Sequence, residues 1–147
     1  NMADIMAAIG LAQLERYEGI LNRRKEIVNQ LDAGLKSDVI QVLPHQTDYY
    51  ESSRHLYITR VNGASYEQRG KIIEKMAERG ISCNVHYKPL PLLTAYKNLG
   101  FDIKDYPNAY RYFENEVTLP LHTLLSDEDI QYIVKNYKEV VQEVLEA

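Results

Sequence analysis

The start of the chain, over residues 2–14, is apolar on nearly every side when drawn as a helix, and only Asp4 and Gln13 are strongly polar. A surface helix needs one apolar stripe, so a helix with no solvent face is covered on two sides. After Glu15 the apolar residues keep to a single stripe, and charged residues fill the rest of the surface. The pattern therefore predicts one long helix over residues 2–33, whose first half is covered by its own domain and by a second partner.

The rest of the chain predicts short strands and helices punctuated by glycine and proline. Strands are expected over residues 39–43, 56–61, 81–87 and 117–121. Helices are expected from Ser65, which forms a capping box with Gln68, to Gly80, then over residues 92–99 and 107–114, and from Ser126 onward. Strands and helices that do not alternate regularly are typical of an α+β fold. Counting the long helix over residues 2–33 as the first, we expect a small antiparallel sheet with the second, fourth and fifth helices on one face.

The pattern divides the chain into a long helix, residues 1–35, and a small α+β domain, residues 36–147. With 147 residues, of which 45% are hydrophobic, the chain can bury one core. A net charge of −4 without a long basic stripe argues against nucleic acid as a partner. The single cysteine, Cys83, suits a reducing compartment, so we expect a cytoplasmic protein. The apolar start is shorter than the roughly 20 residues that span a bilayer, and no membrane partner is expected.

His86 is the strongest candidate for chemistry. Alternation over residues 81–87 places it on a polar face with Ser82 and Asn84, next to the proline-rich exit of the predicted strand. Histidine titrates near neutral pH, so it suits a group that orients a substrate or carries a proton. The alternative is a structural histidine held by hydrogen bonds. By the same alternation Tyr87 falls on the apolar face, which favours packing in the core.

Other kinds of site find little support in the sequence. Zinc sites need converging ligands, whereas the histidines at positions 45, 55, 86 and 122 are isolated, so no metal is expected. Cys83 falls on the apolar face of its predicted strand, where a thiolate is disfavoured, and is expected to be inert. A Schiff-base lysine is normally desolvated, and none of the nine lysines lies in an apolar run.

Three blocks of the sequence follow one another in the order found in one enzyme family. They are Asn1-x-x-x-Ile5-x-Ala7-Ala8-Ile9-Gly10-x-x-Gln13-Leu14; Gly80-Ile81 with Val85-His86-Tyr87-x-Pro89-Leu90; and Leu119-Pro120-Leu121-His122 followed by Ser126-Asp127-Glu128-Asp129-Ile130. Together they cover nearly all of the chain. On these residues the chain resembles the C-terminal part of the DegT/StrS-type family of pyridoxal-phosphate-dependent sugar aminotransferases.

The resemblance implies the C-terminal small domain of a fold-type I aminotransferase. Such an enzyme transfers an amino group, usually from glutamate, to a keto-sugar nucleotide in amino-sugar biosynthesis, for example for cell-surface polysaccharide. The resemblance places the cofactor lysine in a preceding large domain, which this chain lacks. Pyridoxal phosphate is therefore expected in the complete enzyme but not covalently on this chain, and activity of the chain alone is left open. The implied partners are the large domain, a second subunit of a homodimer and a nucleotide sugar.

The resemblance also gives roles to four residues. The loop that bears His86 and Tyr87 would lie over the active-site cleft at a subunit interface, so both side chains would face the substrate. Lys88 would meet a substrate phosphate, and the alternative is a solvated surface charge. Asn1 would reach across the dimer to the cofactor phosphate, a role that suits an amide near a helix N-terminus. The alternative for Asn1 is a plain N-cap.

A second hypothesis belongs to a different class of protein. The chain would be a stand-alone α+β interaction module that dimerises through the helix over residues 2–14. Sequence upstream of Asn1 distinguishes the two hypotheses. A large α/β domain that bears a lysine supports the aminotransferase, and a start codon next to Asn1 supports the module.

Overall fold

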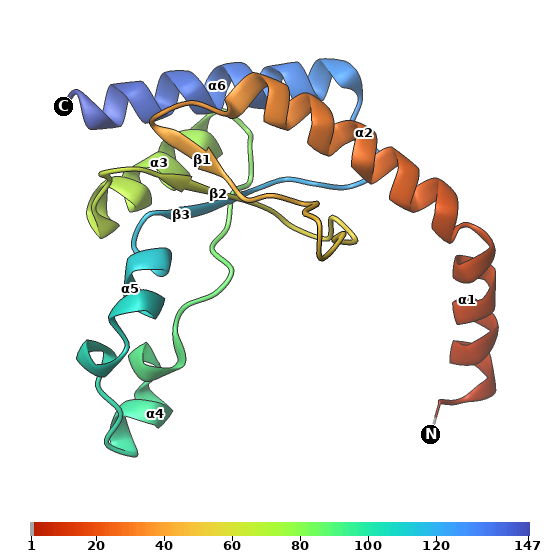
Figure 1. The fold of residues 1–147 in the computed structure, drawn as a ribbon, viewed down its shortest axis with the longest axis horizontal. Helices are drawn as coiled ribbons and strands as arrows, with labels where there is room; N and C mark the ends of the chain where they lie inside the picture. The colour runs from red at the N-terminus through yellow and green to blue at the C-terminus, as the bar shows by residue number, and fades with distance from the viewer. Residues whose placement is uncertain (1) are drawn as a thin grey trace.

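The computed structural model describes residues 2–147 and replaces the single long helix that we predicted with two helices. Helix α1 spans Asp4–Glu15 and helix α2 spans Tyr17–Leu35. The break falls at Arg16, whose N–H donates to the carbonyl of Gln13, three residues back, at 3.1 Å. This tighter bond ends the first helix, and Figure 1 shows α2 setting off in a different direction from α1.

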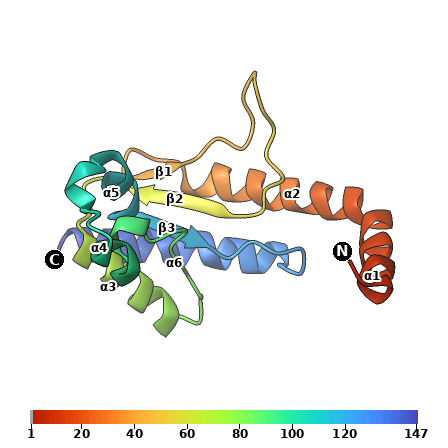
Figure 2. The same ribbon diagram turned by 90° about the horizontal axis from the view of Figure 1, so that it is seen from below.

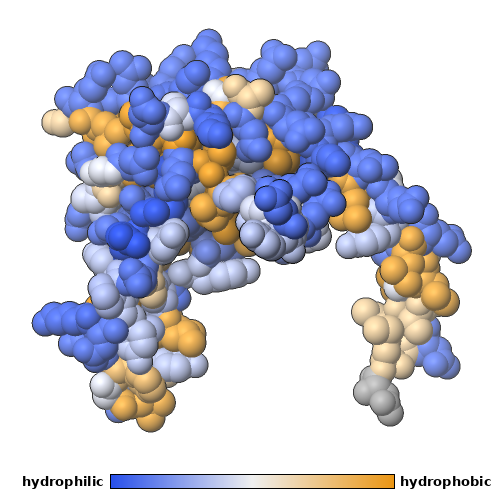
Figure 3. Space-filling view, in the orientation of Figure 1, coloured by the Kyte–Doolittle hydropathy of each residue, from blue (hydrophilic) through white to orange (hydrophobic). Residues whose placement is uncertain are grey.

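Helix α1 stands away from the rest of the molecule in both ribbon views, Figures 1 and 2. None of its residues is buried, and 76% of Ile5 and 52% of Ile9 are exposed. Figure 3 shows the apolar colour on this projecting helix. The expectation that its own domain covers α1 is wrong. Among the helices and strands of the described residues, only α2 makes substantial contact with α1. An exposed apolar surface of this kind is typical of a site that contacts another domain or protein.

The sheet has three antiparallel strands in the order β1-β2-β3. They correspond to three of the four strands that the sequence predicted. Strand β1 spans Ile40–Val42, β2 spans Tyr57–Val61 and β3 spans Glu116–Leu119. The register pairs Thr59 with Val117 on one face, and Ile58 with Thr118 and Arg60 with Glu116 on the other. One face is therefore apolar and the other carries polar side chains.

The core lies on the apolar face of the sheet, under helices α2, α3 (Tyr66–Glu78) and α6 (Asp127–Leu145). Figure 1 shows α2 and α6 side by side above the strands. The capping boxes of Ser65 with Gln68 and of Ser126 with Asp129 begin α3 and α6, which confirms both predicted starts. We expected the fourth predicted helix in this layer, but α2 takes that place, because four residues on one side of α2 are buried: Ile27, Val28, Leu31 and Leu35.

Residues 81–87 do not form the predicted strand. Asn84 makes one antiparallel bridge with Thr118, through two backbone bonds of 2.8 and 3.0 Å. The ladder stops there because the next N–H that would join it, that of His86, binds a side chain instead of the backbone of β3. The N–H of Val85 donates to the side chain of Asn84, and that of His86 donates to the carboxyl of Glu116. The segment is thus an irregular neighbour of β3.

Residues 89–114 form the small lobe below the sheet in Figure 1. It contains two single-turn helices, Leu90–Leu92 and Ile103–Asp105, and two short α-helices, α4 (Thr94–Asn98) and α5 (Pro107–Phe113). The α+β class with a small antiparallel sheet is confirmed. Within residues 2–147, none of the helices has the length and apolar character needed to cross a membrane.

Candidate functional site

His86 lies on the polar face of the sheet, beside the middle of β3. Its Nδ1 atom lies 3.0 Å from Oγ1 of Thr118, and its backbone N–H donates to Oε2 of Glu116 at 2.9 Å. The ring is half-buried and meets the ring of Tyr87 edge-on, with 4.7 Å between the ring centroids. The sequence predicted the polar face for His86, and the structure supplies the partners that hold the ring there.

Glu116 and Thr118 are the two buried polar residues beneath His86. They are two positions apart on β3, so their side chains share a face, and the Thr118 hydroxyl donates to Oε1 of Glu116. Burial raises the pKa of Glu116. The hydrogen bonds from Thr118 and from the backbone of His86, and the nearby Arg69, act in the opposite direction. A buried carboxyl, a hydroxyl and an imidazole therefore form one chain of hydrogen bonds.

Two arginines flank the hydrogen bonds that join Glu116, Thr118 and His86. Arg69 of α3 is only 6% exposed, and its guanidinium lies over the rings of Tyr66 and Phe113, at 4.7 and 4.8 Å from their centroids. Arg60, the cross-strand neighbour of Glu116, donates to the side chain of Asn115 at 3.0 Å. The polar face of the sheet thus brings positive charge close to the Glu116 carboxyl.

Tyr87 and Lys88 lie on the outside of the loop that follows His86. Tyr87 is 73% exposed, so its predicted packing in the core is wrong; an irregular loop does not keep the alternation of a strand. Lys88 is exposed and lines a cavity of about 220 Å³ together with a second lysine, Lys97, and four other residues, Tyr66, Leu92, Tyr110 and Phe113. His86 and Tyr87 therefore meet, while Lys88 belongs to an adjacent hollow.

The remaining predicted positions add no reactive group to this site. Asn1 lies outside the described residues, so its predicted contact with a cofactor phosphate stays a prediction. None of the nine lysines is buried, and the least exposed, Lys75, pairs with Glu143 at 3.1 Å. Burial raises the pKa of the Cys83 thiol to about 12, which keeps it protonated and inert. Within residues 2–147 no three histidine, cysteine, aspartate or glutamate side chains converge as metal ligands would.

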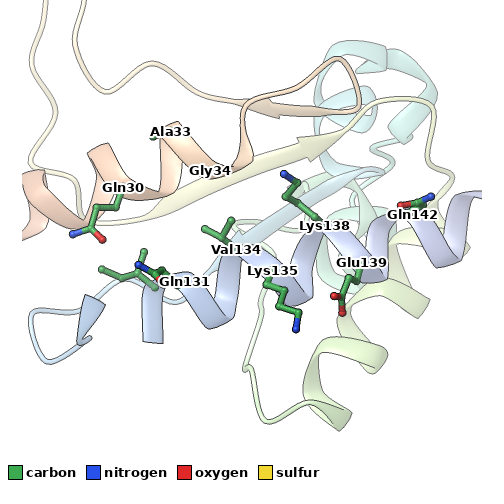
Figure 4. A pocket seen from close by; sticks show the side chains of 10 residues that line it. Gln30, Ala33, Gly34, Gln131, Val134, Lys135, Lys138, Glu139 and Gln142 are labelled. Carbon is green, nitrogen blue, oxygen red and sulfur yellow. The ribbon is translucent and has the colours of Figure 1, made fainter. Parts of the chain in front are cut away.

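A groove larger than the hollow beside Lys88 lies elsewhere, between α2 and α6. It has a volume of about 750 Å³ and is lined by residues such as Gln30, Gly34, Val134 and Lys138, as Figure 4 shows. These helices cover the apolar face of the sheet, whereas His86 lies on the polar face. The groove is therefore separate from the His86 site, and it gathers no reactive side chains.

Sequence reasoning missed Glu116, Thr118 and Arg69. A signal for the first two was present, because an acid and a hydroxyl two positions apart in an otherwise apolar strand must share a face. Their pairing with His86 joins segments 30 residues apart and depends on the tertiary fold. Arg69 lies in a helix whose other charged residues are mostly exposed, so no local pattern marks its burial.

Comparison with known proteins places this chain in one family. Residues 1–138 match the DegT/DnrJ/EryC1/StrS aminotransferase family, and the chain belongs to it. The family is pyridoxal-phosphate-dependent, and its members related to this chain are sugar aminotransferases. The predicted resemblance is confirmed.

Individual relatives support this assignment. Spr1654 of Streptococcus pneumoniae, assigned as a sugar aminotransferase and solved in its PMP form, is 61% identical over 99% of this chain, with a TM-score of 0.96. Helicobacter pylori PseC, an aminotransferase of pseudoaminic acid biosynthesis, is 26% identical over 97% of the chain, with a TM-score of 0.84. The UDP-4-amino-4,6-dideoxy-N-acetyl-beta-L-altrosamine transaminase of Campylobacter jejuni is 29% identical over 98% of the chain.

The chain spans between 34% and 38% of the length of the curated relatives that it matches here, and 37% of Spr1654. Its matched fold is the small sheet with its helices, so the rest of each relative has no counterpart in these 147 residues.

Proposed function

We propose that this chain is the C-terminal small domain of an aminotransferase that uses pyridoxal phosphate to aminate a keto-sugar nucleotide. One observation carries the proposal: the chain matches 37% of Spr1654 at 61% identity, and the matched part has the same fold. The cofactor lysine then belongs to the unmatched part of the complete enzyme. This division agrees with the exposure of the lysines in this chain, because an exposed lysine keeps its charge and is a poor nucleophile.

In this proposal the chain supplies a wall of the substrate site. His86 and Tyr87 stand together at the surface of the polar face, with the exposed tyrosine ring against the histidine ring. A nucleotide sugar offers hydroxyl groups and phosphates, which an imidazole, a phenol and an ammonium group can bind. Lys88 and Lys97 would contribute the positive charge that a diphosphate needs. Asn1 would add a contact to the cofactor phosphate of the partner subunit.

The exposed apolar surface of α1 fits this assembly. A helix that is apolar all round and projects from its domain can be covered by a large domain on one side and by a second subunit on the other. The alternative, a stand-alone module that dimerises through residues 2–14, uses the same helix. The length of the relatives favours the aminotransferase over the module.

The experiment that tests this proposal uses the complete protein that contains these residues. Bound pyridoxal phosphate absorbs visible light, and glutamate should convert it to the pyridoxamine form. A keto-sugar nucleotide should then restore the first spectrum and become an amino sugar, detected by mass spectrometry. A protein without a lysine-bearing domain upstream of residue 1, or one that leaves both spectra unchanged, would contradict the proposal.

A further inference from the structure

Counting the protons along the chain of Glu116, Thr118 and His86 fixes which nitrogen of the histidine carries hydrogen. A threonine hydroxyl has one proton, and an ionised carboxylate can only accept hydrogen bonds. The Thr118 proton is directed to Oε1 of Glu116, so its oxygen is left to accept. Nδ1 of His86, at 3.0 Å from the same oxygen, must therefore be the donor.

The count requires an ionised Glu116. Burial raises the pKa of this carboxyl above its ordinary value, and its hydrogen bonds and the nearby positive charge act against that rise. Its second oxygen, Oε2, accepts the backbone N–H of His86, a group that can only donate. The Arg69 guanidinium adds positive charge close by. With one oxygen taken by a fixed donor and the other by a hydroxyl, both oxygens of the carboxylate have hydrogen-bond partners. A protonated Glu116 would instead donate from Oε1 to Thr118, whose hydroxyl would then donate to Nδ1 of His86.

We propose that Glu116 acts through Thr118 as a positioning residue that holds His86 in its Nδ1–H form, leaving Nε2 to accept a hydrogen bond or a proton from a hydroxyl of the sugar. This inference rests on the proposed function, in which His86 faces the substrate. Nε2 has no hydrogen-bond partner among residues 2–147, so its lone pair is available. A diphosphate carries no proton at neutral pH, so neutral His86 recognises the sugar rather than the phosphates.

The arrangement also serves proton transfer. When Nε2 takes a proton from a substrate hydroxyl, the imidazolium keeps its Nδ1–H bond to Thr118, and the negative charge of Glu116 lies one hydroxyl away. A carboxylate placed behind a histidine stabilises the positive charge that forms on the ring. The proton returns to the substrate oxygen by the same bond, so no group is consumed.

The test uses the complete protein with ring-labelled histidine, studied by nitrogen NMR at about pH 8.5, where an ordinary histidine is neutral. The His86→Asn variant identifies the signal of His86 by its loss. We expect the Nδ1–H form in the unchanged protein and in Thr118→Ser, which keeps a hydroxyl. Thr118→Val has nearly the same shape without a hydroxyl, and it should shift His86 toward the Nε2–H form that an unconstrained histidine side chain prefers.

Kinetics of the same variants separates positioning from folding. Thr118→Val should lower kcat by roughly tenfold with little change in KM, and Thr118→Ser should recover most of the loss. Glu116→Gln keeps the shape but removes the charge and replaces one of the two accepting oxygens with a donating NH2 group, so it should also lower kcat, by roughly tenfold. Ile58→Val is the matched control, because Ile58 faces Thr118 across the sheet and takes no part in the bonds. It should leave both the NMR signal and kcat unchanged.

The outcomes distinguish this inference from the proposed function. An Nε2–H signal in the unchanged protein, or a Thr118→Val protein with normal tautomer and turnover, would overturn the positioning role. Full turnover of Glu116→Gln would overturn the role of its charge. If Thr118→Val changes the tautomer while His86→Ala keeps full turnover, the hydrogen-bond chain exists but His86 does not serve the substrate, and the proposed function of this site fails instead.

Discussion

Glu116 holds His86 by two routes, directly through the backbone N–H at 2.9 Å and indirectly through the Thr118 hydroxyl, which lies 3.0 Å from the imidazole ring. The first bond fixes the position of the chain, and the second fixes the ring. A histidine whose backbone and ring are both held in place is pre-organised for a ligand, and this limits the entropy lost on binding.

Helix α1 should make the main contact between subunits or domains. Replacing Ile9 by Asp places a charge on the exposed apolar surface, so an oligomer of the complete protein should dissociate or weaken. Sedimentation velocity measures the change in mass. Gln131→Asp adds the same charge to an exposed position of α6 and should have no effect. An unchanged mass for the Ile9→Asp protein would show that α1 is not at the interface.

The cofactor should be attached outside this chain. Treating the complete protein with borohydride in the presence of pyridoxal phosphate reduces the imine and labels its lysine permanently. Peptide mapping should find the label upstream of residue 1, because the lysines of this chain are exposed or paired at the surface. A label on Lys88, or on any other lysine among these residues, would contradict the proposal that the cofactor lysine lies outside this chain.

A buried hydrogen bond between Tyr137 and Thr59 should stabilise the core. Thr59 donates its only proton to the carbonyl of Val117 at 2.8 Å, so the Tyr137 hydroxyl, at 2.7 Å, must donate to Thr59. Tyr137→Phe should lower the free energy of unfolding by about 1 kcal/mol, measured by urea denaturation. Tyr49→Phe, at a position that is 95% exposed, should change it by less than about 0.5 kcal/mol. Equal effects of the two changes would rule out the assigned bond.

The packing of α2 on α6 depends on Gly34. A Cβ atom at this position would lie 2.7 Å from a methyl group of Val134, the residue that faces it across the groove in Figure 4. Gly34→Ala should therefore destabilise the fold by about 1–3 kcal/mol. Gly70→Ala in α3 meets no atom within 4 Å and should stabilise by up to about 1 kcal/mol through helix propensity. Thermal unfolding compares the two, and a stabilising Gly34→Ala would show that Val134 moves aside freely.

Local chemistry predicted much of the fold. The starts of α3 and α6 follow from Ser65 and Ser126, whose caps involve residues only three positions away. The expected strand over residues 81–87 failed for a reason outside that range, because Glu116 takes the N–H of His86 that a ladder would have used. Alternation still placed His86 on the polar side, but it could not reveal Thr118 as the partner of the ring, since that contact spans 32 positions.

The local sequence pattern also could not predict the helix break at Arg16 or the exposure of α1. The apolar start of the chain predicts a cover, and this stays a prediction. Whether the same domain could supply the cover depends on where α1 points. The loop residues Tyr87 and Lys88 show the same limit, because an irregular segment has no period from which to read a direction.

The turnover of His86→Ala in the complete protein tests the central claim most directly. The rate to measure is the conversion of the pyridoxamine form by a keto-sugar nucleotide in a single turnover, with folding checked by circular dichroism. We predict a fall of roughly a hundredfold or more with folding intact, and partial recovery in His86→Asn if hydrogen bonding alone is needed. His55→Ala, at an exposed histidine, is the control and should keep the full rate. A His86→Ala protein with the unchanged rate, or one that unfolds, would show that His86 is structural.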